Sequence, residues 1–108
     1  MQLLLEYGAD PNMQNKDGYT ALICASVYGC TDIVQLLLEN GVDPNIQDKD
    51  GYTALMFASE WGYKEIVQLL LEYGADPNIK NNRGRIALAV ALGREYYDIV
   101  ELLEPYIK

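Results

Sequence analysis

Residues 17–22 of the chain read DGYTAL, and residues 50–55 repeat the same six letters 33 positions later. A degraded copy, RGRIAL, follows after another 33 positions at residues 83–88. When residues 16–48 are aligned with residues 49–81 without a gap, 22 of the 33 positions are identical. Self-similarity at a fixed period of this length predicts a solenoid, in which each repeat is one supersecondary unit stacked on the next.

Two short helices are expected in each unit. Thr20 and Thr53 stand where a hydroxyl can accept an unpaired backbone N–H at a helix start, and a first helix over residues 22–28 follows in the first full unit. A second helix is expected over about residues 31–40. Its apolar face consists of Ile33, Val34, Leu37 and Leu38.

Glycines and Asp-Pro-Asn segments separate these helices. Gly29 and Gly62 are expected to end the first helix at a turn with positive φ, and Gly41 to cap the second helix. The segment Asp-Pro-Asn at residues 10–12, 43–45 and 76–78 is a turn signal before the next unit. The last unit is atypical: Ile86 replaces the threonine, the turn glycine is expected at Gly93, and Pro105 lies near its end.

This pattern resembles the ankyrin repeat. The second unit shows it most completely, with GYTALM at residues 51–56, Gly62, IVQLLL at 66–71 and GADPN at 74–78. Ala54 stands where the family usually has proline, and Met56 where it has a histidine that ties neighbouring loops together. The resemblance implies an all-α ankyrin-repeat solenoid of helix-turn-helix pairs joined by β-turn finger loops.

We expect one domain over residues 1–108. It would comprise a partial repeat at 1–14 with only its second helix, full repeats at 15–47 and 48–80, and a C-terminal capping repeat at 81–108. Because residues 1–12 align with residues 34–45, we expect the chain to start inside a repeat, as a fragment or an engineered chain would. The helix Met1–Tyr7 would then lack part of its packing, so we expect a monomer that can self-associate through this helix.

Charge and cysteine content restrict the setting and the partners. A net charge of −8 and a pI near 4.3 argue against nucleic acid and anionic membranes, which attract basic surfaces. No apolar run approaches the length of a membrane span. Two cysteines without a disulfide framework favour a reducing, cytoplasmic setting.

Catalytic and metal chemistry find little support in the chain. There is no histidine, the commonest general base and metal ligand. Cys24 is expected on a packing face and Cys30 near a turn, neither beside an activating base. The loop-like DKDG at residues 48–51 would need calcium ligands where Ile46 and Phe57 stand. We therefore predict no enzyme, no cofactor and no metal site.

The resemblance implies that a partner protein is bound at the concave face, which the loop tips and first helices form. The candidate residues are Lys16, Asp17, Tyr19, Tyr28, Lys49, Asp50, Tyr52, Glu60, Trp61, Arg85 and Arg94.

Two columns of equivalent positions stand out in this set. The loop column reads Tyr, Tyr, Arg at positions 19, 52 and 85, and the helix column reads Tyr, Trp, Arg at positions 28, 61 and 94. These residue types are the commonest binding hot spots. A tyrosine before the threonine is also common in the family, where it can simply shield the loop. Arg83, Arg85 and Arg94 either favour an acidic partner segment or are solvated arginines near the chain end.

The predicted function is therefore a protein–protein interaction module. Two alternatives remain open: a regulator or inhibitor of an enzyme, as some small ankyrin proteins are, and a structural spacer or engineered scaffold without a natural ligand.

Overall fold

The chain folds as two parallel columns of helices with three loops projecting from one side. The computed structural model describes residues 12–107, and in that part it contains six α-helices and one short 3-10 helix. They are α2 (Ala21–Val27), α3 (Thr31–Glu39), α4 (Ala54–Trp61), α5 (Lys64–Glu72), α6 (Ala87–Gly93), α7 (Tyr97–Leu103) and η1 (Glu104–Tyr106). The helix expected over Met1–Tyr7 lies outside the described residues, and so does its expected role in self-association.

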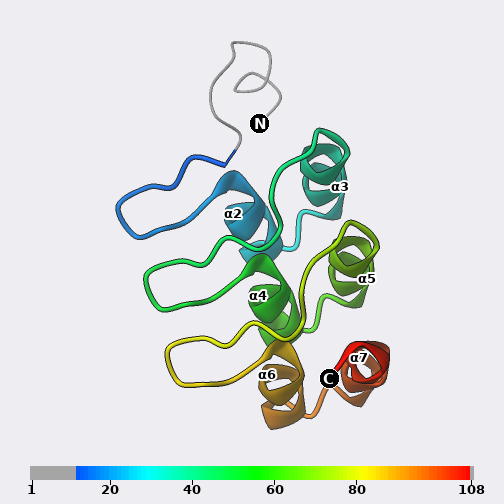
Figure 1. Cartoon of the computed structure of the whole chain (residues 1–108). Coiled ribbons are helices and arrows are strands. Elements are labelled where there is room, and N and C mark those ends of the chain that lie inside the picture. The colour runs from blue at the N-terminus through cyan, green and yellow to red at the C-terminus, as the bar shows by residue number, and fades with distance from the viewer. Residues whose placement is uncertain (1–11, 108) are drawn as a thin grey trace.

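Helices α2, α4 and α6 form the inner column, and α3, α5 and α7 form the outer column (Figure 1). Each inner helix contacts the outer helix of its own pair, and α4 contacts both of the other inner helices, α2 and α6. The three loops that precede the inner helices project to one side as fingers (Figure 1). The predicted all-α solenoid is therefore confirmed, with each helix pair as one layer.

Threonine side chains start the first two inner helices, as the sequence predicts. The Thr20 hydroxyl accepts the backbone N–H of Ile23 at 3.1 Å, and the Thr53 hydroxyl accepts that of Met56 at 3.3 Å. Helix α6 begins after Ile86, which has the same extended backbone but no side chain that can cap the helix. Each threonine satisfies one of the N–H groups that a helix start leaves unpaired.

The turn between the paired helices corrects one expectation. Gly29 and Gly62 have the predicted positive φ, at 72° and 79°. In the last pair, however, the left-handed position is Glu95 at φ 63°, and Gly93 is the last residue of α6. The prediction of the turn at Gly93 is therefore wrong: the backbone keeps the 33-residue period although the glycine does not.

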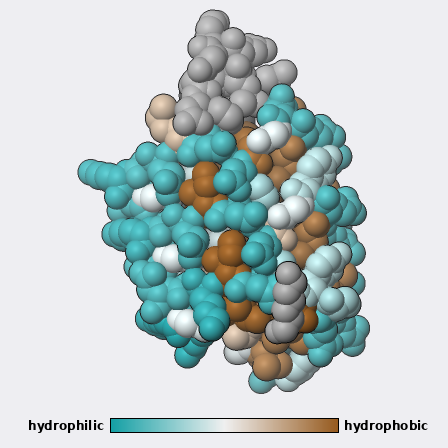
Figure 2. Space-filling model, viewed as in Figure 1, coloured by the Kyte–Doolittle hydropathy of each residue, from teal (hydrophilic) through white to brown (hydrophobic). Residues whose placement is uncertain are grey.

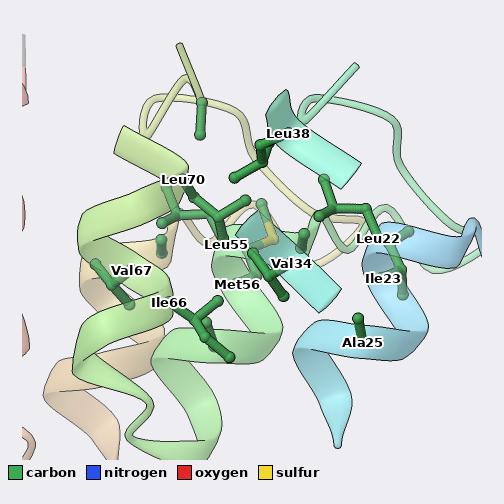
Figure 3. Packing of buried hydrophobic residues seen from close by; sticks show 14 of the residues in the cluster. Leu22, Ile23, Ala25, Val34, Leu38, Leu55, Met56, Ile66, Val67 and Leu70 are labelled. Atoms are coloured by element: carbon green, nitrogen blue, oxygen red, sulfur yellow. The ribbon is translucent and has the colours of Figure 1, made fainter. Parts of the chain in front are cut away.

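One apolar core runs through all three helix pairs. In Figure 3, Leu22 and Ile23 of α2 lie on one side of Leu55 and Met56 of α4, and Val34 of α3 lies between them. The side chains of these residues are at most 2 % exposed. Such packing between layers makes each pair depend on its neighbours, as in other repeat proteins.

Ile33 departs from the predicted apolar face. It is 36 % exposed, whereas the equivalent Ile66 and Ile99 are each 1 % exposed. Ile66 lies on α5, which packs against α3, and Ile99 lies on α7, which packs against α5. No outer helix precedes α3 within the described residues, so Ile33 has no equivalent cover there. Val34, Leu37 and Leu38 are buried as expected.

Candidate partner-binding surface

The finger loops share one internal brace. Asn15, Asp48 and Asn81 occupy equivalent positions, and the Oδ1 atom of each accepts backbone N–H groups two and four residues later, at 2.8–3.1 Å. In the middle finger, Asp48 receives these bonds from Asp50 and Tyr52. A side chain that binds its own backbone in this way fixes a tight turn. The finger tips therefore have defined positions before any partner arrives.

Neighbouring fingers are also joined to one another. The backbone N–H of Lys49 donates to the carbonyl of Asp17 at 3.2 Å, and that of Asn82 donates to the carbonyl of Asp50 at 3.0 Å. The Lys49 ammonium also lies 3.2 Å from the Asp17 carboxylate, and this contact raises the pKa of Lys49. Asp17 and Lys49, both predicted partner contacts, are thus paired with each other across the first two fingers. In the view of Figure 2 the fingers are mostly hydrophilic, and the apolar areas lie inward of them, towards and over the helix columns.

The helix column of predicted contacts lies where the inner helices end. Tyr28, directly after α2, is 78 % exposed, and Trp61, the last residue of α4, is 49 % exposed. Arg94 follows α6, and its guanidinium carbon lies 5.8 Å from the centroid of the Trp61 ring. Arg94 also lies 3.9 Å from the Glu60 carboxylate. The structure therefore brings Glu60, Trp61 and Arg94 together and leaves Tyr28 as the most exposed aromatic residue of this column.

The two tyrosines of the loop column are half-buried around a phenylalanine that sequence reasoning missed. Tyr52 packs against Phe57 with ring centroids 4.9 Å apart, and Tyr19 of the preceding finger meets the same ring edge-on at 6.3 Å. The Tyr52 hydroxyl lies 3.5 Å from Glu60, and partial burial together with this carboxylate raises the pKa of Tyr52. Both tyrosines therefore help to pack the loops, as the shielding interpretation predicts, while part of each ring stays accessible.

Two hollows open between the fingers and the inner helices. The aromatic hollow, of about 350 Å³, is lined by Tyr19, Asp48, Asp50, Tyr52, Phe57, Glu60, Asn82 and Arg83. The arginine hollow, of about 210 Å³, is lined by Tyr52, Glu60, Arg83, Arg85, Ala89, Val90, Gly93 and Arg94. Tyr52, Glu60 and Arg83 line both hollows, which are therefore adjacent. Five of the eleven predicted contacts line neither hollow: Lys16, Asp17, Tyr28, Lys49 and Trp61. Lys16 is exposed near the tip of the first finger.

The side chains of the three arginines differ in the contacts that they make with the rest of the protein. Within residues 12–107 the side chains of Arg83 and Arg85 form no ion pair or hydrogen bond, and both residues are exposed. Arg94 has the two contacts described above and remains 53 % exposed. The side chains of Arg83 and Arg85 are therefore not engaged within this range, whereas the side chain of Lys49 is already paired with Asp17.

Reactive groups are sparse elsewhere in the described part of the chain. Among residues 12–107, no group of three or more Cys, Asp or Glu side chains is placed to hold a metal ion. Cys24 is a half-buried free thiol, and burial raises the pKa of Cys24, which disfavours the nucleophilic thiolate. None of the helices in this range has both the length and the apolar character needed to cross a bilayer.

The helix pairs stack on one another, each finger turn is fixed by its own side chain, and neighbouring fingers are joined by hydrogen bonds. These features define a repeat protein of the solenoid class. The sequence matches the family model described as ankyrin repeats (3 copies) over residues 1–81. The chain belongs to the ankyrin-repeat family. Proteins of this family generally act as protein–protein interaction modules and are typically not enzymes.

Proposed function

We propose that the chain is a binding module, not an enzyme, and that it holds a partner protein on its finger face. The finger face is the surface formed by the finger loops and the ends of α2, α4 and α6, which the family resemblance places on the concave side. Its proposed contacts are Lys16, Asp17, Tyr19, Tyr28, Lys49, Asp50, Tyr52, Glu60, Trp61, Arg85 and Arg94.

One observation carries this proposal: Tyr28 and Trp61 are large, exposed and equivalent by the repeat. They are 78 % and 49 % exposed, while the aromatic residues of the fingers pack against Phe57. Aromatic side chains supply much contact area at a small entropic cost, because only two torsions are fixed on binding. Truncating a buried aromatic anchor costs about 2 kcal/mol or more, which is roughly thirtyfold in affinity.

The braced fingers support the same proposal. Asp48 and its equivalents fix each turn, and the backbone bonds of Lys49 and Asn82 hold the spacing between fingers. A surface that is already ordered loses little conformational entropy when a partner binds, so more of the contact energy appears as affinity. The free thiols Cys24 and Cys30 support a reducing, cytoplasmic setting for this interaction.

The proposal is tested by site-specific photocrosslinking in cells. A benzophenone amino acid would replace Tyr28 or Trp61, and a control chain would carry it in place of Gln68, which is exposed on the outer helix α5. We expect positions 28 and 61 to crosslink the same protein and position 68 to give a weaker product or none. Equal or stronger crosslinking from position 68 would place the partner on the outer helices and contradict the proposal.

A variant pair supplies the control for affinity. Tyr28→Ala/Trp61→Ala should keep the helical circular dichroism of the wild type, because neither side chain belongs to the buried core. It should lose the crosslinked protein when purified from the same cells. Retention of that protein by the folded double variant would contradict the proposal, and absence of any crosslinked protein would favour a structural spacer.

A further inference from the structure

We infer that the arginine hollow binds an acidic side chain, an aspartate or glutamate, within an extended segment of the partner. This inference rests on the proposed function and adds the chemistry of the ligand. It concerns the end of the finger face formed by the third finger and α6, where Arg83, Arg85 and Arg94 line one hollow of about 210 Å³.

The concentration of arginines at this hollow is unexpected in so acidic a chain. The sequence has 8 Lys and Arg residues against 16 Asp and Glu, yet all three of its arginines line the same hollow. Glu60 is the one carboxylate among the lining residues. Arg83 and Arg85 form no ion pair within residues 12–107, so their charge is available to a ligand.

Arg94 is held ready for such a contact. Its guanidinium lies over the Trp61 ring, 5.8 Å from the centroid, and 3.9 Å from Glu60. Stacking on an aromatic face restricts the side chain while leaving its N–H groups able to donate. A carboxylate accepts two parallel bonds from one guanidinium, so the planar fork of arginine suits this ligand better than the point charge of lysine.

The charges on the rest of the molecule favour binding of an anion at the end formed by the third finger and α6. The outer helices α3, α5 and α7 carry six acidic residues, Asp32, Glu39, Glu65, Glu72, Asp98 and Glu101, and one basic residue, Lys64. An acidic segment is repelled from that side and attracted to the third finger.

The same charges orient the segment and select the kind of anion. The adjacent aromatic hollow contains Asp48, Asp50 and Glu60 against Arg83 alone. The acidic residue of the segment must therefore lie towards α6, and an apolar part of the segment would cover the aromatic hollow. Because Glu60 lines both hollows, a carboxylate with one negative charge meets less repulsion there than a phosphate with nearly two.

The test selects ligands from a random peptide library displayed on phage, with the full chain immobilised. Selected peptides are synthesised with a fluorophore, and their affinities are measured by fluorescence anisotropy. We expect them to contain Asp or Glu beside apolar residues. Replacing that acid by Asn or Gln, or introducing Arg85→Gln into the protein, should each weaken binding about tenfold or more. The two changes combined should weaken binding little further, because both remove the same contact.

Controls separate charge, geometry and location. Lys64→Gln removes one positive charge from the outer helix α5 and should leave the affinity unchanged. Arg85→Lys retains the charge but not the fork, and should recover only part of the lost affinity. A peptide with phosphoserine in place of the acid should bind no more tightly than the parent, and tighter binding would overturn the assignment to a carboxylate.

The outcomes also distinguish this inference from the proposed function. One outcome would overturn the inference and leave the proposed function in place. In it, the selected peptides contain no acid, bind the Arg85→Gln variant as tightly as the wild type, and fail to bind Tyr28→Ala/Trp61→Ala. Peptides that are insensitive to both the arginine and the aromatic changes would overturn both, because the finger face would not be the binding surface. A library that yields no peptide above background counts against both.

Discussion

Alanine at position 62 should destabilise the chain much more than alanine at position 74, although both glycines have left-handed backbones. Gly62 has φ 79° and Gly74 has φ 90°. A Cβ atom on Gly62 would lie 3.0 Å from Cζ of Tyr96, with two further ring atoms at 3.2 and 3.3 Å. A Cβ atom on Gly74 would meet no atom within 4 Å. The pair of variants therefore separates backbone strain from packing between repeats.

The magnitudes follow from these two components. Left-handed backbone costs an alanine about 1–2 kcal/mol, offset by about 0.4–1 kcal/mol because alanine restricts the unfolded chain. Gly74→Ala should therefore cost about 1 kcal/mol. Gly62→Ala adds an overpacking cost of about 1–3 kcal/mol, because the half-buried Tyr96 ring packs against the core and must shift as a body. The expected total for Gly62→Ala is about 2–4 kcal/mol.

Urea unfolding followed by circular dichroism measures both variants. The difference between them should be at least about 1 kcal/mol, and it should shrink when both are made in a Tyr96→Ala background, where the ring is gone. A difference that persists without the ring would show that the cost arises elsewhere. Equal costs at positions 62 and 74 in the wild-type background would refute the packing argument.

Three further outcomes follow from single residues. Glu95→Gly should stabilise the chain by about 0.5–1 kcal/mol in urea unfolding, because Glu95 has φ 63°; Glu95→Ala, which keeps a Cβ atom, should bring no such gain. Thr53→Val should cost about 1–2 kcal/mol, because an isosteric side chain leaves the buried N–H of Met56 without its acceptor; unchanged stability would show that this cap does not matter. Cys24 should react with iodoacetamide more slowly than glutathione at pH 8, since burial raises the pKa of Cys24 and lowers its thiolate fraction, and mass spectrometry of the labelled chain would detect the opposite order.

The features that could be predicted from the sequence are those that each repeat determines within itself. Thr53 caps its own helix, and Gly62 ends the same helix. Their positions in the 33-residue period were therefore sufficient to predict where that helix begins and ends. The errors concern relations between repeats. The exposure of Ile33 depends on whether an outer helix of the preceding layer packs against α3. The tolerance of Glu95 in a left-handed turn depends on whether a ring of the next repeat covers that position, as Tyr63 covers Gly29 and Tyr96 covers Gly62. The residue pattern within one repeat predicts neither the exposure of Ile33 nor the left-handed backbone of Glu95.

The candidate surface likewise has residues whose positions could be predicted from one repeat and a residue whose role depends on two repeats. The helix column of Tyr28, Trp61 and Arg94 was predicted from repeat alignment and family resemblance, and the structure places these residues at equivalent helix ends. Phe57 was missed, although it replaces Cys24 at the equivalent position of an otherwise similar repeat. Its role depends on Tyr19 from one finger and Tyr52 from the next meeting at its ring, and only the three-dimensional arrangement shows this.

The bonds that hold the fingers explain how such a scaffold can vary its ligand without losing its fold. The turns are fixed by the side chains at positions 15, 48 and 81. The spacing between fingers is fixed by backbone bonds and by the side-chain amides of Gln14, Gln47 and Asn82. Tip side chains such as Tyr52 and Arg85 are equivalent in position, and each donates its backbone N–H to the same kind of brace. The side chain at that position is therefore free to change from tyrosine to arginine between repeats, and the charge of the finger face can change along the solenoid while its geometry does not.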